Sequence, residues 1–162
     1  MFNRNNKINS AENLLDKKAL RLAAMDLLAR REHSLAELQR KLSHRAQSAE
    51  ELQAVLQQLI TDGLQSDLRF AGMYIRTKCQ RGDGLAKIRM GLKEKGITDA
   101  LLQAALAEEE VDWFAMAADV ARRRFELPVA DLRARDKALR YLVGKGYSFE
   151  QAKYALCAAD DE

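Results

Sequence analysis

The sequence predicts an all-α protein, built as an elongated array of three tandem three-helix repeats, and three observations support this prediction. The 162 residues include one proline and eight glycines, too few for the many tight turns of a β-rich protein. No segment has the alternating, β-branched pattern that is typical of strands. The chain also resembles itself at a spacing of about 50 residues, which is the sequence signature of a repeat architecture.

The repeat spacing aligns apolar positions and helix starts. Each block has a leucine followed by a hydroxyl residue, at Leu42 and Ser48, Leu92 and Thr98, and Leu142 and Ser148. Hydroxyl side chains are preferred at helix N-termini because they accept a hydrogen bond from the first turn. Ser34, Ser48 and Ser148 also have Glu or Gln three positions later, which predicts a reciprocal capping box. Thr98 offers only the simple cap.

In chain order we expect a flexible tail over residues 1–16, then repeats over residues 17–65, 66–111 and 112–162. The expected helices are Lys17–Arg31, Ser34–Ser43, Ser48–Asp62, Leu68–Gln80, Leu85–Glu94, Thr98–Glu109, Asp112–Phe125, Ala134–Val143 and Ser148–Ala158. The run Gly82-Asp83-Gly84 predicts a turn between two helices. Pro128 separates the first two helices of the last repeat, because it lacks a backbone donor and clashes one turn back.

Composition argues against an enzyme, a metalloprotein and a membrane protein. No apolar run approaches the about 18 residues of a membrane span, and no phosphate-binding loop motif occurs. Cys79 and Cys157 form no close pair, which suits a reducing cytoplasm, and neither has a neighbouring base. We expect His33 and His44 to lie at solvent-exposed helix ends rather than to bind a metal. The sequence thus predicts no catalytic residue, no cofactor and no metal.

Charge is segregated along the chain although the net charge is only +3. Residues 66–95 carry eight basic and three acidic side chains, and residues 119–145 carry eight and four. Residues 98–113 carry five acidic side chains and no basic one. Such clustering predicts a basic stripe that meets phosphates or acidic protein surface. Its candidate residues are Arg69, Arg76, Lys78, Arg81, Lys87, Arg89 and Lys93 in the second repeat, and Arg122, Arg123 and Arg140 in the third.

Helical spacing predicts which of these side chains face outward. If Leu85, Ile88 and Leu92 face the core, Lys87 and Lys93 point away from it. Arg76 likewise projects outward from the preceding helix, and Arg81 follows at the turn. We expect Arg76, Arg81 and Lys87 to be available to a partner, since exposed charges need no burial.

Three motifs in the middle block resemble the signature of the RecX family of regulators. They are Ser66-Asp67-Leu68-Arg69-Phe70-Ala71, Arg81-Gly82-Asp83-Gly84-Leu85-Ala86-Lys87-Ile88 and Leu92-Lys93-Glu94-Lys95-Gly96-Ile97. The first block adds Ser34-Leu35-Ala36-Glu37-Leu38 with Lys41-Leu42. Two positions depart from the family pattern: Ser66 replaces an acidic residue, and Asp83 stands where a basic or aromatic residue is frequent.

The resemblance implies a small cytoplasmic bacterial protein that binds RecA recombinase. RecX-like proteins are three tandem three-helix repeats that sit in the groove of the RecA filament on single-stranded DNA. They block its extension or promote its disassembly, which lowers the recombinase, ATPase and coprotease activities. For this chain we therefore expect RecA as the partner, a possible weak contact with DNA through the basic face, and a monomer.

The alternative is direct DNA binding, either as a helix-turn-helix transcription factor or as a single-strand binder. The first block resembles the start of a winged helix-turn-helix, but this fold needs a β-ribbon after Gly63, and the residues that follow look helical. The ten aromatic residues lie mostly at core-like spacings, which leaves few platforms for stacking bases.

Overall fold

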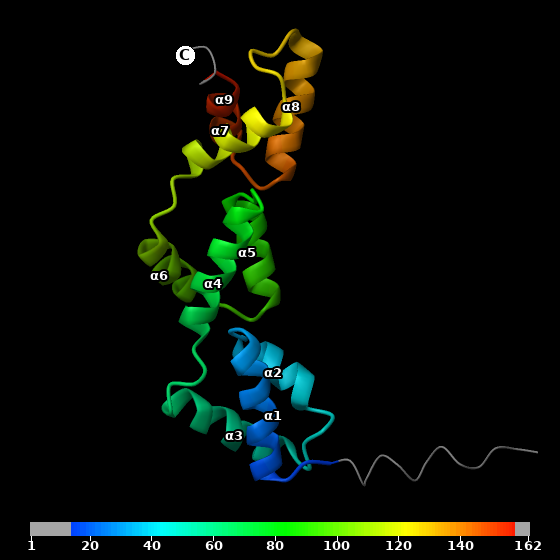
Figure 1. Cartoon of the computed structure of the whole chain (residues 1–162), viewed down its shortest axis with the longest axis vertical. Helices are drawn as coiled ribbons and strands as arrows, with labels where there is room; N and C mark the ends of the chain where they lie inside the picture. The colour runs from blue at the N-terminus through cyan, green and yellow to red at the C-terminus, as the bar shows by residue number, and fades with distance from the viewer. Residues whose placement is uncertain (1–13, 158–162) are drawn as a thin grey trace, which may run out of the picture. The chain divides into compact units, whose positions relative to one another are not determined.

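The computed structural model describes residues 14–157, and this part of the chain folds into nine α-helices with no named strand (Figure 1). The helices are α1 Lys17–Arg30, α2 Leu35–Leu42, α3 Ala49–Thr61, α4 Asp67–Gln80, α5 Leu85–Glu94, α6 Asp99–Glu109, α7 Trp113–Arg124, α8 Leu132–Gly144 and α9 Phe149–Cys157. The predicted all-α repeat fold is confirmed. Helix α4 occupies the place where a winged helix-turn-helix would need its β-ribbon, so that resemblance ends at Gly63.

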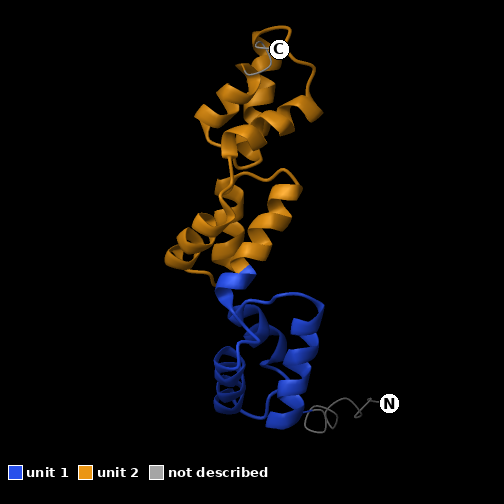
Figure 2. Cartoon of the chain, turned by 60° about the vertical axis from the view of Figure 1, so that its left-hand side comes forward, with its two compact units in different colours: residues 1–70 blue, residues 71–162 orange. Residues whose placement is uncertain are grey.

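The chain divides into two compact units, the first ending at Phe70 and the second beginning at Ala71 (Figure 2). The division falls inside the first turn of α4 rather than between α3 and α4. Helices α1–α3 therefore form the first unit, whereas α5–α9 belong to the second together with most of α4. The second and third repeats share one unit because their turns are bonded to each other, as described below.

Each unit buries the apolar positions that the repeat spacing aligned. In the first unit Leu42 packs with Leu20, Leu38 and Leu56 between α1, α2 and α3. In the third repeat the core consists mainly of alanines of α7 and α9, with Leu142 and Leu156 among them. Small side chains allow these two helices to approach closely. Leu42, Leu92 and Leu142 are all almost completely buried, which confirms the alignment.

The helix caps confirm the predicted N-termini, with one exception. Ser34 and Ser148 make reciprocal boxes: each hydroxyl accepts a backbone N–H three residues on, and the Glu37 or Gln151 side chain accepts the cap's own N–H. Thr98 makes the simple cap. At Ser48 only the hydroxyl half of the box is recorded, and Oε2 of Glu51 is buried without a hydrogen-bond partner among the described residues.

Among the described residues, helix boundaries agree with the sequence prediction to within one residue except at the start of α8. Helix α8 begins at Leu132 instead of Ala134, because the Asp131 carboxylate caps it by accepting from the Ala134 N–H at 2.8 Å. Residues 1–13 of the expected tail, and Ala158 at the end of the last expected helix, lie outside the described residues. Leu15, the next to last residue of that tail, forms a bridge with Ala46, and its N–H donates to the Arg45 carbonyl at 2.7 Å. Ordered structure thus begins before α1.

Candidate functional site

The turn between α4 and α5 is held by the turn between α8 and α9, within the second unit (Figure 1). The Gly84 N–H donates to the Lys145 carbonyl at 2.7 Å, and the Ala86 N–H donates to the Gly146 carbonyl at 3.0 Å. These bonds satisfy backbone groups at the start of α5, which has no side-chain cap. The predicted turn at residues 82–84 is therefore a docking point between repeats.

Glycine is required on both sides of this contact. A Cβ atom built on Gly84 would lie 2.4 Å from the carbonyl carbon of Gly146. Gly146 itself has φ +104°, and a Cβ there would lie 2.7 Å from the backbone nitrogen of Lys87. Backbone atoms cannot move aside as a flexible side chain can, so any larger residue would separate the two turns.

A buried carboxylate joins the same two turns. Asp83 is 5% exposed, and its Oδ1 lies 3.2 Å from Nζ of Lys87 and 3.1 Å from Nζ of Lys145. Burial alone would raise the pKa of Asp83, but hydrogen bonds and charge from the two lysines outweigh burial and lower it. The Tyr147 hydroxyl completes the contact by donating to the Gly82 carbonyl at 2.8 Å. Asp83 is thus a charged link between the repeats.

Two cations expected to be available to a partner are already paired. Arg76 and Lys87 do project outward, but Arg76 forms a short ion pair with Glu109 of α6, and Lys87 is bound to Asp83. Both side chains stay more than half exposed, so their contact with a partner stays a prediction. Glu109 lies on another helix, so helical periodicity could not predict its pair with Arg76, whereas Asp83 lies one helical turn before Lys87.

The remaining candidates of the second repeat differ in their surroundings. Arg81, Arg89 and Lys93 are exposed, and among residues 14–157 none of them has an ion-pair partner. We call these three the α5 basic face: Arg81 lies in the turn before α5, and Arg89 and Lys93 lie on α5.

Lys78 is half-buried, with its Nζ 5.3 Å from the ring centre of Tyr74. Arg69 belongs to the first unit, where it pairs with Glu32 at 3.0 Å.

The third repeat holds its three candidates on two helices. On α7, Arg122 pairs with Asp119 at 2.6 Å, while Arg123 is exposed and has no ion-pair partner in the described part of the chain. On α8, Nε of Arg140 donates to the backbone carbonyl of Asp136 at 3.4 Å. The structure also places Arg124, Arg133 and Lys137 near the α7–α8 connection, although sequence analysis did not single them out.

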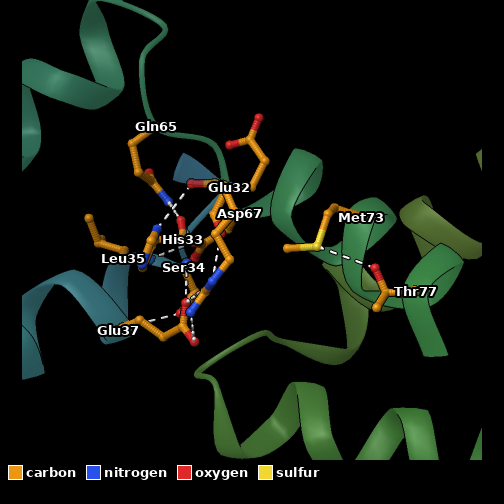
Figure 3. Close-up of polar contacts among 10 residues, drawn as sticks. Glu32, His33, Ser34, Leu35, Glu37, Gln65, Asp67, Met73 and Thr77 are labelled. Atoms are coloured by element: carbon orange, nitrogen blue, oxygen red, sulfur yellow. Dashed lines mark hydrogen bonds and ion pairs between the residues drawn. The ribbon is translucent and has the colours of Figure 1, made fainter. Parts of the chain in front are cut away.

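A buried polar cluster ties α2 to the α3–α4 connection in the first unit (Figure 3). Nε2 of Gln65 donates to the His33 carbonyl at 3.2 Å and to Oδ1 of Asp67 at 2.8 Å. The same carboxylate accepts from the Leu35 N–H at 2.8 Å, so it caps α2 from a distant segment. His33 is only 2% exposed, and the expectation of a solvent-exposed histidine is wrong here, whereas His44 is exposed.

Burial of His33 makes the stability of the protein pH-dependent. Desolvation lowers the pKa of His33 below the value of 6.5 that it has when unfolded. The unfolded chain therefore takes up a proton first as the pH falls through 6.5, and the free energy of unfolding decreases. We expect the urea midpoint to fall more in wild type than in His33→Asn when the pH is lowered from above to below this value. His44→Asn is the matched control and should keep the wild-type dependence; equal behaviour of both variants would contradict the assignment.

The described residues hold no group of three or more His, Cys, Asp or Glu side chains placed to bind a metal ion. Burial raises the pKa of the Cys79 thiol, and the carboxylates of Glu109 and Asp83 raise it further, which opposes formation of a nucleophilic thiolate. Of helices α1–α9, none is long and apolar enough to cross a membrane.

Comparisons with known proteins identify the family of the chain. The family model for the second three-helix domain of RecX matches residues 66–106, and the model for the third matches residues 110–156. The regulatory protein RecX of Chromohalobacter salexigens is 39% identical over 136 residues, which cover 84% of this chain and 90% of the relative. RecX of Neisseria meningitidis serogroup C is 39% identical over 145 residues, or 90% of this chain and 94% of the relative.

A solved structure supports the fold independently. The crystal structure of RecX from Lactobacillus salivarius superimposes with a TM-score of 0.72 at 22% sequence identity. The match covers 90% of this chain and 97% of that chain. The similarity therefore extends over nearly the whole chain rather than over one repeat.

Proposed function

The chain belongs to the RecX family of regulatory proteins, and on this premise we propose that it binds RecA and its filament on single-stranded DNA. Binding inhibits the recombinase, ATPase and coprotease activities of RecA, because the bound protein blocks filament extension or promotes disassembly. The chain performs no chemistry of its own in this role. It works in the cytoplasm, where RecA and DNA are found.

The α5 basic face is the observation that carries this proposal. An exposed cation without an internal partner can meet a carboxylate or phosphate without first breaking an ion pair. The docked turns next to Arg81 hold this part of the backbone in one conformation, which reduces the entropy lost on binding. Rim charges of this kind chiefly raise the association rate and make it sensitive to salt.

Retention on immobilised single-stranded DNA, with and without RecA, tests the proposal. We expect the chain to be retained when RecA and a slowly hydrolysed ATP analogue have formed filaments, and to pass through on DNA alone. Equal retention on bare DNA would favour the alternative, a direct DNA-binding protein. Failure to be retained on either support would contradict both.

A further inference from the structure

The connection between α7 and α8 encloses a hollow that none of the contacts described above explains. Its volume is about 420 Å³, and its wall combines apolar groups of Phe125, Pro128, Val129 and Ala134 with the cations Arg124 and Lys137. A second hollow of about 400 Å³ is also lined by Ala134 and Lys137, so the two adjoin along α8. We call the two hollows together the α8 groove: the first is its apolar end, and the second, lined by Arg133, Lys137 and Arg140, is its basic end.

The basic end of the α8 groove has unbalanced positive charge. Arg133, Lys137 and Arg140 are spaced so that they share one face of α8, and all three are exposed. Four cations line the two hollows against two acidic residues, Glu126 and Asp131. The Asp131 carboxylate accepts the Ala134 N–H as the N-cap of α8, and the four cations still exceed the two acidic residues.

The apolar end is held in place by aromatic packing. Phe125 and Tyr141 pack edge to face, with ring centres 5.4 Å apart. The Arg124 guanidinium lies over both rings, 5.8 Å from the centre of Phe125 and 5.2 Å from that of Tyr141. These contacts keep Arg124 at the groove wall and make the rings poor platforms for stacking a base.

We propose that the α8 groove binds an acidic peptide segment that carries an apolar side chain. Its carboxylates would pair with the α8 cations, and its apolar side chain would fill the hollow beside Val129. A nucleic acid fits less well, because phosphates would use the cations but leave the apolar end uncovered. The α7–α8 connection lies apart from α5 (Figure 1). Peptide binding at the α8 groove can therefore fail or succeed independently of the proposed function.

Fluorescence anisotropy with three labelled probes tests the groove on the full chain. The probes are a peptide of aspartate and glutamate with a central phenylalanine, the same peptide with alanine instead, and an oligothymidylate of equal charge. We expect the phenylalanine peptide to bind most tightly. Lys137→Glu should lower the affinity for the phenylalanine peptide about tenfold or more, as for a central contact of an interface. Lys41→Glu, the same substitution at an exposed site on α2 of the first unit, should change the affinity less than about twofold.

A second variant tests the apolar end without a change of charge. Ala134→Leu fills the hollow, so it should lower the affinity for the phenylalanine peptide and leave the affinity for the alanine peptide unchanged. Circular dichroism and thermal unfolding would establish that each variant is folded. Equal binding of the two peptides, tighter binding of the oligothymidylate, equal loss in Lys137→Glu and Lys41→Glu, or no binding of any probe would each overturn the proposal.

Discussion

Simultaneous reversal of the α5 basic face, Arg81→Glu, Arg89→Glu and Lys93→Glu, should remove most inhibition of the RecA DNA-dependent ATPase. The side chains are exposed and unpaired among the described residues, so their replacement breaks no internal contact. Exposed substitutions of this kind change the free energy of unfolding by within about 0.5 kcal/mol each. The concentration of the variant that is required for inhibition should therefore rise at least about tenfold, with little change in the unfolding transition.

The structure also indicates which residues to leave unchanged. Reversal of Arg76 or Lys87 would place a new carboxylate beside Glu109 or Asp83, so a loss of inhibition could reflect a loss of folding. A triple reversal at the exposed residues Arg40, Lys41 and Arg45 of the first unit is the matched control for net charge. Equal loss of inhibition in both triple variants, or full inhibition by the α5 variant, would contradict this location of the contact.

Replacement of Gly146 by alanine should strongly destabilise the second unit. Residues other than glycine are strained at φ +104°, at a cost of about 1–3 kcal/mol. The added Cβ would also lie 2.7 Å from Lys87 N and 2.8 Å from Gly84 O. Both effects act on the turn that joins the repeats, so the free energy of unfolding should fall by about 3 kcal/mol or more.

Gly144→Ala is the control for this experiment. Nothing lies within 4 Å of a Cβ at Gly144, which is the last residue of α8. Alanine is favoured over glycine in a helix by about 0.5–1 kcal/mol, so this variant should be as stable as wild type or slightly more so. Urea unfolding followed by circular dichroism measures both variants. A midpoint for Gly146→Ala equal to that of Gly144→Ala would show that the two turns do not depend on their close approach.

Local sequence determined the helices of this protein and most of their ends. Ser34, Thr98 and Ser148 cap helices through atoms three residues away, so the sequence contains all that the interaction needs. Apolar periodicity placed Ile88 and Leu92 on the buried face of α5 for the same reason, since a helix places regularly spaced residues on one face. The family resemblance likewise depended on short motifs within single repeats.

Only the tertiary structure decided which charged groups are available and which are paired. Asp83 meets Lys145 of another repeat, Arg76 meets Glu109, and His33 is covered together with Gln65. Each of these contacts joins segments whose separation along the chain has no fixed relation to their separation in space. The energy of an ion pair depends on the distance between charges and on their burial, and both quantities are set by the packing of helices. Helical periodicity therefore predicted that Arg76 and Lys87 point outward, whereas the packing of turns and helices determined that Arg81, Arg89 and Lys93 form no ion pair among the described residues.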